Sequence, residues 1–141
     1  MNHRSIAAVR DFPPDGVMTD CYSGLRILLV EDDQKTRLAL TRLLSARKHT
    51  IFPAATMAEA RELAKKQSFD LLITVIGLPD GNGHELMAKL GGPAKLGGIA
   101  MTGYGMDEDI DRSRQVGFSA HLTKPVRVQS LSEAIRVAMT I

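Results

Sequence analysis

The sequence predicts an α/β protein with a doubly wound, five-stranded parallel sheet, and three observations support this fold class. Two short and largely apolar runs, 27–30 and 71–75, have the character of strands buried on both faces of a parallel sheet. The segments between such runs carry apolar residues at intervals of three and four, which is the spacing of a helix with one buried face. The two kinds of segment alternate along 141 residues, a length typical of one domain.

In the first half of the chain the predicted elements alternate between strand and helix. In order, they cover residues 27–30, about 34–47, about 50–54, a helix from Thr56 onward, and 71–75. Leu40, Leu43 and Leu44 indicate the first helix, because they recur at the spacing of one helical face. The second helix begins at Thr56, since Thr56 and Glu59 form a capping box.

The second half continues this alternation. The elements cover about 83–90, 98–101, about 107–116, 120–123 and a final helix that starts near Ser130. Gly91-Gly92-Pro93 ends the first of these helices, and the acids of 107–109 favour a helix start through the helix dipole. Ser130 and Glu133 form a second capping box. Five strand–helix units with right-handed crossovers, (βα)5, predict a flavodoxin-like sheet with strand order 2-1-3-4-5.

The chain divides into an irregular N-terminal tail, 1–24, and one folded domain, 25–141. The tail contains Pro13-Pro14 and scattered charges but no apolar core of a secretory signal. No stretch is apolar for long enough to span a bilayer, and a net charge of +2 argues against a nucleic-acid partner. The single cysteine, Cys21, excludes an intramolecular disulfide and fits a reducing compartment, so we expect a cytoplasmic protein.

Candidate functional side chains follow the predicted strands, at the sheet edge where doubly wound folds place their sites. Glu31, Asp32 and Asp33 come after the first strand, Thr102 after the fourth and Lys124 after the fifth. Carboxylates suit Mg²⁺, which prefers hard oxygen ligands. A lysine and a hydroxyl can contact the oxygens of a phosphoryl group. The edge therefore predicts a site for a divalent cation and an anion, although Asp33 is better explained as a helix cap.

In their order and spacing these residues resemble the receiver domain of two-component response regulators. The matching motifs are Glu31-Asp32, the loop 78–83, Thr102 and Lys124-Pro125. The resemblance covers 25–141, and the segment 99–125 looks most like receivers attached to hybrid sensor histidine kinases. It implies a CheY-like fold, a role in phosphorelay signalling and a cis peptide bond before Pro125.

The resemblance also implies roles for individual residues. Glu31, Asp32 and the carbonyl group of Gly77 would hold Mg²⁺, and Lys124 and Thr102 would contact the phosphoryl group. Thr102 and His121 would act as switch residues, although His121 is equally well explained as a half-exposed strand residue. The other two histidines of the folded part, His49 and His84, are expected at the surface.

Val75 departs from the family pattern, because it stands where the family has the aspartate that accepts the phosphoryl group. Valine has neither a nucleophile nor an acceptor oxygen, so we predict a pseudo-receiver that has lost this chemistry and is not an enzyme. Mg²⁺ would bind weakly, and no cofactor would bind tightly. The alternative is a phosphorylatable receiver in which Val75 is an engineered substitution or a sequence error. Asp80 and Thr74 do not replace the aspartate. Asp80 lies further along the loop, which is expected to carry it out of the cleft, and Thr74 faces the other side of the strand.

Further expectations concern the contacts of Lys124 within the chain and the protein to which the domain binds. Lys124 is expected to pair with Asp32 and hold the domain in one state. The protein partner would be a sensor histidine kinase, a hybrid-kinase domain or another protein. It would bind the face formed by the helix 107–116, the strand 120–123 and the final helix, with no membrane involved. A nucleotide-binding flavodoxin-like protein is disfavoured, because the acids 31–33 would repel phosphate where that class binds it.

Overall fold

The computed structural model describes residues 24–90, 96–103 and 107–139, with the side chains of 107–110 excepted. The predicted tail, apart from Gly24, and the predicted helix stop at 91–93 lie outside the described residues. Among the described helices, none is both long enough and apolar enough to cross a bilayer.

The core of the molecule is a five-stranded parallel sheet with the order β2-β1-β3-β6-β7, which confirms the predicted order. The strands are β1 (Arg26–Val30), β2 (Thr50–Ala54), β3 (Leu71–Val75), β6 (Gly97–Thr102) and β7 (Ala120–Thr123). Two further strands, β4 (Gly77–Leu78) and β5 (Gly81–Asn82), form a small antiparallel hairpin that the sequence pattern did not indicate.

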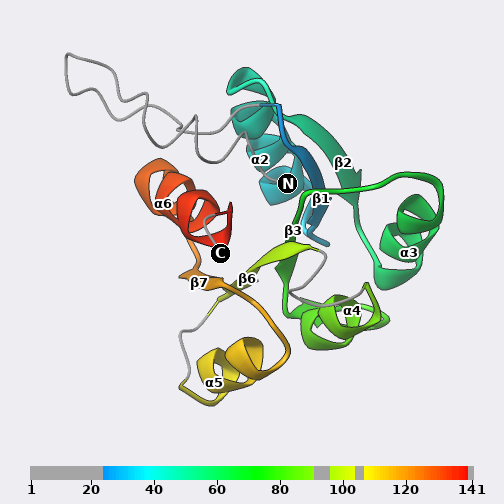
Figure 1. Cartoon of the computed structure of the whole chain (residues 1–141), viewed down its shortest axis with the longest axis vertical. Helices are drawn as coiled ribbons and strands as arrows, with labels where there is room; N and C mark the ends of the chain where they lie inside the picture. Colours follow the sequence, from blue (N-terminus) through cyan, green and yellow to red (C-terminus); the bar gives the residue numbers. More distant parts are fainter. Residues whose placement is uncertain (1–23, 91–95, 104–106, 140–141) are drawn as a thin grey trace.

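Five helices cover the sheet in the described residues. They are α2 (Gln34–Ala46), α3 (Met57–Lys66), α4 (Gly83–Lys89), α5 (Asp107–Gln115) and α6 (Val128–Met139). Figure 1 shows α2 and α6 on one face of the sheet and α3, α4 and α5 on the other. The chain is therefore doubly wound, as predicted.

Burial follows the position of each strand in the sheet. Every residue of β3 is buried, and β1 is buried except for Arg26, so the central strands carry the apolar runs that identified them. β2 lies at an edge and is only partly buried. An edge strand tolerates Pro53, which has no N–H to donate, because no second strand lies beside it.

The helix starts test the capping predictions. Asp33 caps α2, and its carboxylate accepts the N–H of Thr36 at 2.9 Å. Thr56 caps α3 by accepting the N–H of Glu59 at 3.1 Å, which confirms that predicted start. The start near Ser130 was wrong, because α6 begins at Val128. A Ser-x-x-Glu pattern within the first turns of a helix has the same sequence as one that caps it, and here Ser130 and Glu133 both lie inside α6.

The two histidines expected at the surface are buried, so that prediction was also wrong. His49 is 5% exposed, and its Nδ1 atom accepts the N–H of Leu25 at 3.2 Å. His84 is 5% exposed, and its Nε2 atom lies 3.0 Å from the Ser113 hydroxyl. Each histidine has a partner at least 24 positions away in the sequence. Local periodicity cannot reveal such a contact.

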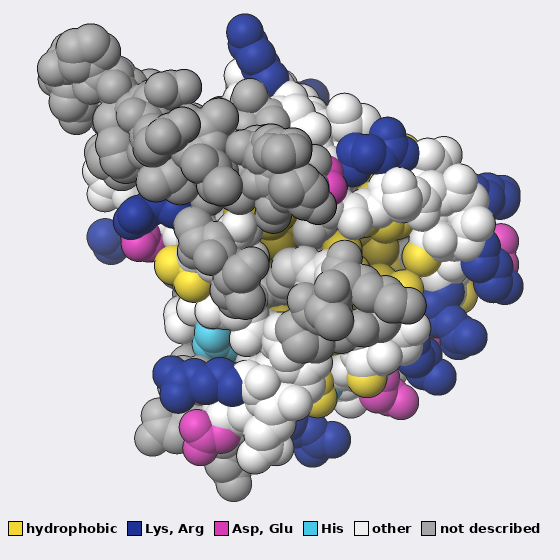
Figure 2. All heavy atoms as spheres, in the orientation of Figure 1, with side chains coloured by type: hydrophobic (Ala, Val, Ile, Leu, Met, Phe, Trp, Pro, Cys, Tyr) yellow, Lys and Arg dark blue, Asp and Glu magenta, His cyan; other side chains and the backbone are white. Residues whose placement is uncertain are grey.

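The visible surface carries charges of both signs. In Figure 2 many of the Lys and Arg side chains stand over α3 and α4, with acidic side chains among them. On α3, Lys65 lies 3.4 Å from Glu62, and both side chains are exposed. Exposed pairs of this kind stabilise a fold by at most about 1 kcal/mol.

Candidate functional site

The register of the sheet brings the predicted site residues to one edge. Val30 pairs with Thr74, so Glu31 follows β1 at the level where Val75 ends β3. Val75 pairs with Met101, and Thr102 is the next residue of β6. The N–H of Lys124 donates to the carbonyl oxygen of Thr102 at 2.7 Å. The carboxyl ends of four neighbouring strands therefore meet here, and the peptide bond between Lys124 and Pro125 is cis.

The central contact of this edge is an ion pair between Lys124 and Glu31. The Lys124 Nζ atom lies 2.6 Å from Oε1 of Glu31, whose side chain is fully buried, while that of Lys124 is 28% exposed. The other carboxylate oxygen, Oε2, accepts the N–H of Asp33 at 3.0 Å. Both oxygens of a carboxylate without access to water are thus compensated, one by a positive charge and one by a backbone donor.

The prediction that Lys124 pairs with Asp32 was wrong. Asp32 is exposed, and within the described part of the chain its carboxylate makes no ion pair. An exposed carboxylate is already solvated by water, whereas a buried one needs a compensating charge. Lys124 therefore goes to Glu31, the acid whose desolvation cost it offsets most.

Val75 contributes to the apolar core rather than to the polar edge. Its side chain is 4% exposed. Its carbonyl oxygen accepts the hydroxyl of Thr74 at 2.9 Å, so this buried threonine is occupied locally. The first residue of α4 lies directly against this strand end: a Cβ atom added at Gly83 would sit 2.6 Å from the Val75 carbonyl oxygen. Only glycine fits there without a shift of backbone.

Asp80 lies in the turn between β4 and β5, away from the ion pair, and caps α3. Its Oδ1 atom accepts the N–H of Met57 at 2.9 Å and its Oδ2 atom accepts the N–H of Ala58 at 3.0 Å. These donors, that of Met57 first, lower the pKa of Asp80 below its ordinary value. The sequence had suggested only that Asp80 leaves the site; its capping role depends on a contact across 23 positions.

The caps of α3 lead to a prediction about pH. Because the folded pKa of Asp80 is lowered, its contribution to stability is present above about pH 4 and is lost as the pH falls below that value. Urea unfolding measures the free energy of unfolding at about pH 6 and about pH 3. The decrease between these two pH values should be smaller for Asp80→Asn than for the original chain. Asp111→Asn, at an exposed position of α5, is the matched control and should retain the original loss. An unchanged loss in Asp80→Asn would contradict the capping role.

The pKa of Asp33 is also lowered below its ordinary value. The hydroxyl of Thr36 at 2.6 Å is the largest cause, followed by the N–H of the same residue, with smaller attractions from Lys124 and Lys35. Asp33 is thus engaged as a helix cap, as the sequence indicated.

The side chains present do not form a complete Mg²⁺ site. Oε1 of Glu31 already faces an ammonium group, and Asp32 is the only other acid of the predicted set. Gly77, whose carbonyl group was the third predicted ligand, lies in the β4–β5 hairpin. No group of three acidic, histidine or cysteine side chains suited to a metal ion occurs in the described residues. A hard cation would have to displace Lys124 to reach Glu31.

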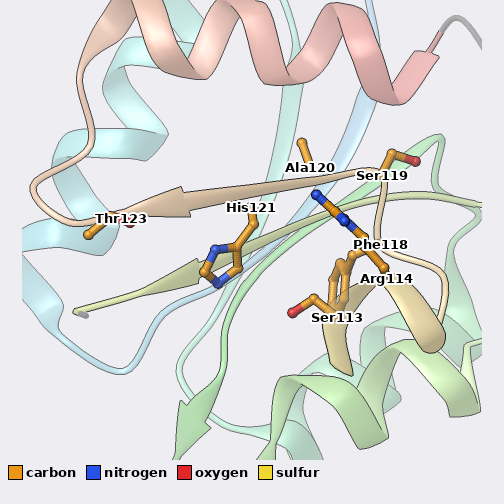
Figure 3. A pocket seen from close by; sticks show the side chains of 7 residues that line it. All are labelled: Ser113, Arg114, Phe118, Ser119, Ala120, His121 and Thr123. Atoms are coloured by element: carbon orange, nitrogen blue, oxygen red, sulfur yellow. The ribbon is translucent and has the colours of Figure 1, made fainter. Parts of the chain in front are cut away.

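The two predicted switch residues lie on adjacent strands. Thr102 ends β6 and is 9% exposed, and it pairs in register with Thr123 of β7. His121 is half-buried on β7, and Figure 3 shows its ring on the side of the strand that faces α5. This placement agrees with both interpretations of His121 given above.

Comparisons with known proteins point to one family. The profile described as the response regulator receiver domain matches residues 27–136. The chain is 33% identical over 103 residues to an uncharacterized 14.6 kDa protein of Leptolyngbya boryana, covering 71% of this chain and 79% of that protein. It is 32% identical over 120 residues to the response regulator protein PilR of Pseudomonas aeruginosa, covering 84% of this chain but 27% of PilR. The chain thus corresponds to only part of this longer relative.

A solved structure gives the same result. The CheY-like response regulator receiver domain protein of Methanospirillum hungatei superposes with a TM-score of 0.75 at 30% sequence identity. The match covers 83% of this chain and 94% of that structure. The likeness therefore extends over most of the chain.

Proposed function

We propose that this chain, which belongs to the response regulator receiver domain family, is a receiver that cannot accept a phosphoryl group and that acts by binding another protein. One observation carries the proposal: β3 ends in Val75, at the position to which the family resemblance assigns the phosphoacceptor aspartate, and this side chain is packed in the core. An acyl phosphate forms only on a carboxylate, and valine has none.

The neighbouring acids are poor substitutes for that aspartate. Glu31 is buried against Lys124, and Asp80 accepts two backbone N–H groups of α3. Lys124, which would otherwise contact a phosphoryl oxygen, is already paired. By the same reasoning, Mg²⁺ would bind weakly, because it would compete with the Lys124 ammonium for Glu31 and would lack a carboxylate from position 75.

The proposed binding surface is formed by α5, β7 and α6. Two apolar side chains of α6 are exposed, Val128 at 41% and Val137 at 39%, although Leu38 of α2 is more exposed at 48%. They are nine positions apart and so flank opposite sides of the buried stripe of α6, where each adds a small apolar contact. The partner would be a sensor histidine kinase, a hybrid-kinase domain or another protein of the same signalling system.

The loss of phosphorylation is tested by mass spectrometry. The intact chain is incubated with acetyl phosphate and Mg²⁺, and its mass should not increase by one phosphoryl group, because position 75 carries no carboxylate and Glu31, the acid that pairs with Lys124, is buried. A receiver known to be phosphorylated by acetyl phosphate is treated in parallel as the positive control. A stoichiometric adduct that maps to 31–33 or 70–83 would show that the chain is a working phosphoacceptor.

A further inference from the structure

A cavity of about 300 Å³ lies between α5 and β7. Figure 3 shows that the side chains of Arg114 and His121 extend into the space between the helix and the strand. The volume is at the lower end of the range for small-molecule sites. The cavity is therefore large enough for a small organic molecule.

The polar groups of this cavity favour one sign of charge. Its lining includes the guanidinium group of Arg114, the imidazole of His121 and three hydroxyl groups, those of Ser113, Ser119 and Thr123. Among the lining residues that the structure describes, none carries a carboxylate. Guanidinium and hydroxyl groups donate hydrogen bonds to carboxylate and phosphate oxygens, and arginine does so with two parallel bonds. The lining is thus suited to an anion.

Arg114 is available for such a ligand. It is exposed, and within the described part of the chain its guanidinium group forms no ion pair or hydrogen bond. An arginine that stabilised the fold through its charge would instead pair with an acid, as Arg136 does with Glu133 on α6. Beside these polar groups lies the ring of Phe118, which is 5% exposed and provides an apolar wall.

We propose that the cavity between α5 and β7 binds a small organic anion, a carboxylate or a phosphate monoester attached to an apolar body. The anionic group binds the Arg114 guanidinium, and the apolar body packs on Phe118. The inference does not depend on the fate of position 75, since the lining residues include neither Val75 nor the ion pair of Glu31 and Lys124, although Thr123 is the neighbour of Lys124.

The cavity is also connected to the loop that follows Val75. The hydroxyl of Ser113 lies 3.0 Å from Nε2 of His84, the second residue of α4, and both side chains are buried. Asn82, which caps α4, belongs to the β4–β5 hairpin. A ligand that displaced the Ser113 hydroxyl would therefore change a contact made by the second residue of α4. This connection would give a receiver without a phosphoacceptor a second way to respond to a signal.

The test uses three probes of similar shape and different charge: benzoate, phenyl phosphate and benzamide. Each is titrated into the ¹⁵N-labelled full chain while the amide signals of 113–123 are followed. Benzoate or phenyl phosphate should shift these signals with a Kd on the order of 1 mM, and neutral benzamide should bind at least about tenfold more weakly. The comparison of the two anions tells a carboxylate ligand from a phosphate ligand.

A pair of arginine variants completes the test. Arg114→Gln should weaken binding of the anion about tenfold, because it removes the charged two-point donor. Arg112→Gln, an exposed arginine on the same helix that does not line the cavity, should change the Kd by less than about twofold. Equal binding of benzamide and benzoate, equal binding by Arg114→Gln and the original chain, or no saturable shift at about 20 mM probe would each overturn the proposal.

Discussion

Val75→Asp is expected to produce a chain that accepts a phosphoryl group from acetyl phosphate and binds Mg²⁺ more tightly, but that is less stable without the metal. The new carboxylate would stand at the end of β3, one strand away from Glu31, at a position that is 4% exposed. Two buried acids would then share the single positive charge of Lys124 and repel each other. Mg²⁺ would gain a hard oxygen ligand and bind only the folded state, so it should reverse the loss of stability.

Thermal melts with and without Mg²⁺ measure this effect. Without metal, a destabilisation of about 1–3 kcal/mol should lower the melting temperature by several degrees. Val75→Asn is the matched control, because asparagine has the size of aspartate but carries neither a charge nor a carboxylate nucleophile. It should lose stability but gain neither the Mg²⁺ response nor the phosphoryl adduct. If Mg²⁺ raises the melting temperature of the valine form as much as that of the aspartate form, position 75 is not a metal ligand.

The parts of the fold that the sequence predicted are those determined by neighbouring residues. The apolar run 71–75 identified a buried central strand, and all five residues are buried. The Thr56 cap follows from a four-residue pattern, and the inner face of α6 from a spacing of three and four. The strand order was expected from the flavodoxin-like pattern of doubly wound sheets, since the rule for right-handed crossovers alone does not determine it.

The details of the site could not be predicted in the same way, because they depend on burial. Glu31 and Asp32 are adjacent acids of the same charge, and no local pattern tells which one is removed from water. The structure buries Glu31 completely and leaves Asp32 exposed, and this difference decides the partner of Lys124. The contact between His84 and Ser113 likewise joins residues 29 positions apart, on two helices whose packing no sequence pattern reveals.

Lys124→Met is expected to be among the most destabilising single changes at this edge of the sheet. It would leave the buried Glu31 carboxylate with one backbone donor and no positive charge. Removing one partner of a fully buried ion pair costs about 3–5 kcal/mol; because Lys124 is 28% exposed and water can partly replace it, we expect about 2–3 kcal/mol. Urea unfolding measures the change. Lys35→Met, at an exposed lysine of α2, is the matched control and should change stability by less than about 0.5 kcal/mol.

A double-mutant cycle with Glu31→Gln separates the ion pair from other effects of the lysine. Glutamine keeps the acceptor for the N–H of Asp33 but removes the charge, so the single variant should cost less than Lys124→Met. In the double variant the uncompensated buried charge is gone, and much of the stability lost in Lys124→Met should return. The two changes would thus show a coupling energy of about 1–2 kcal/mol. If instead the losses simply add, Lys124 stabilises the fold through its packing on Pro125 and the neighbouring apolar groups, and the pair with Glu31 contributes little.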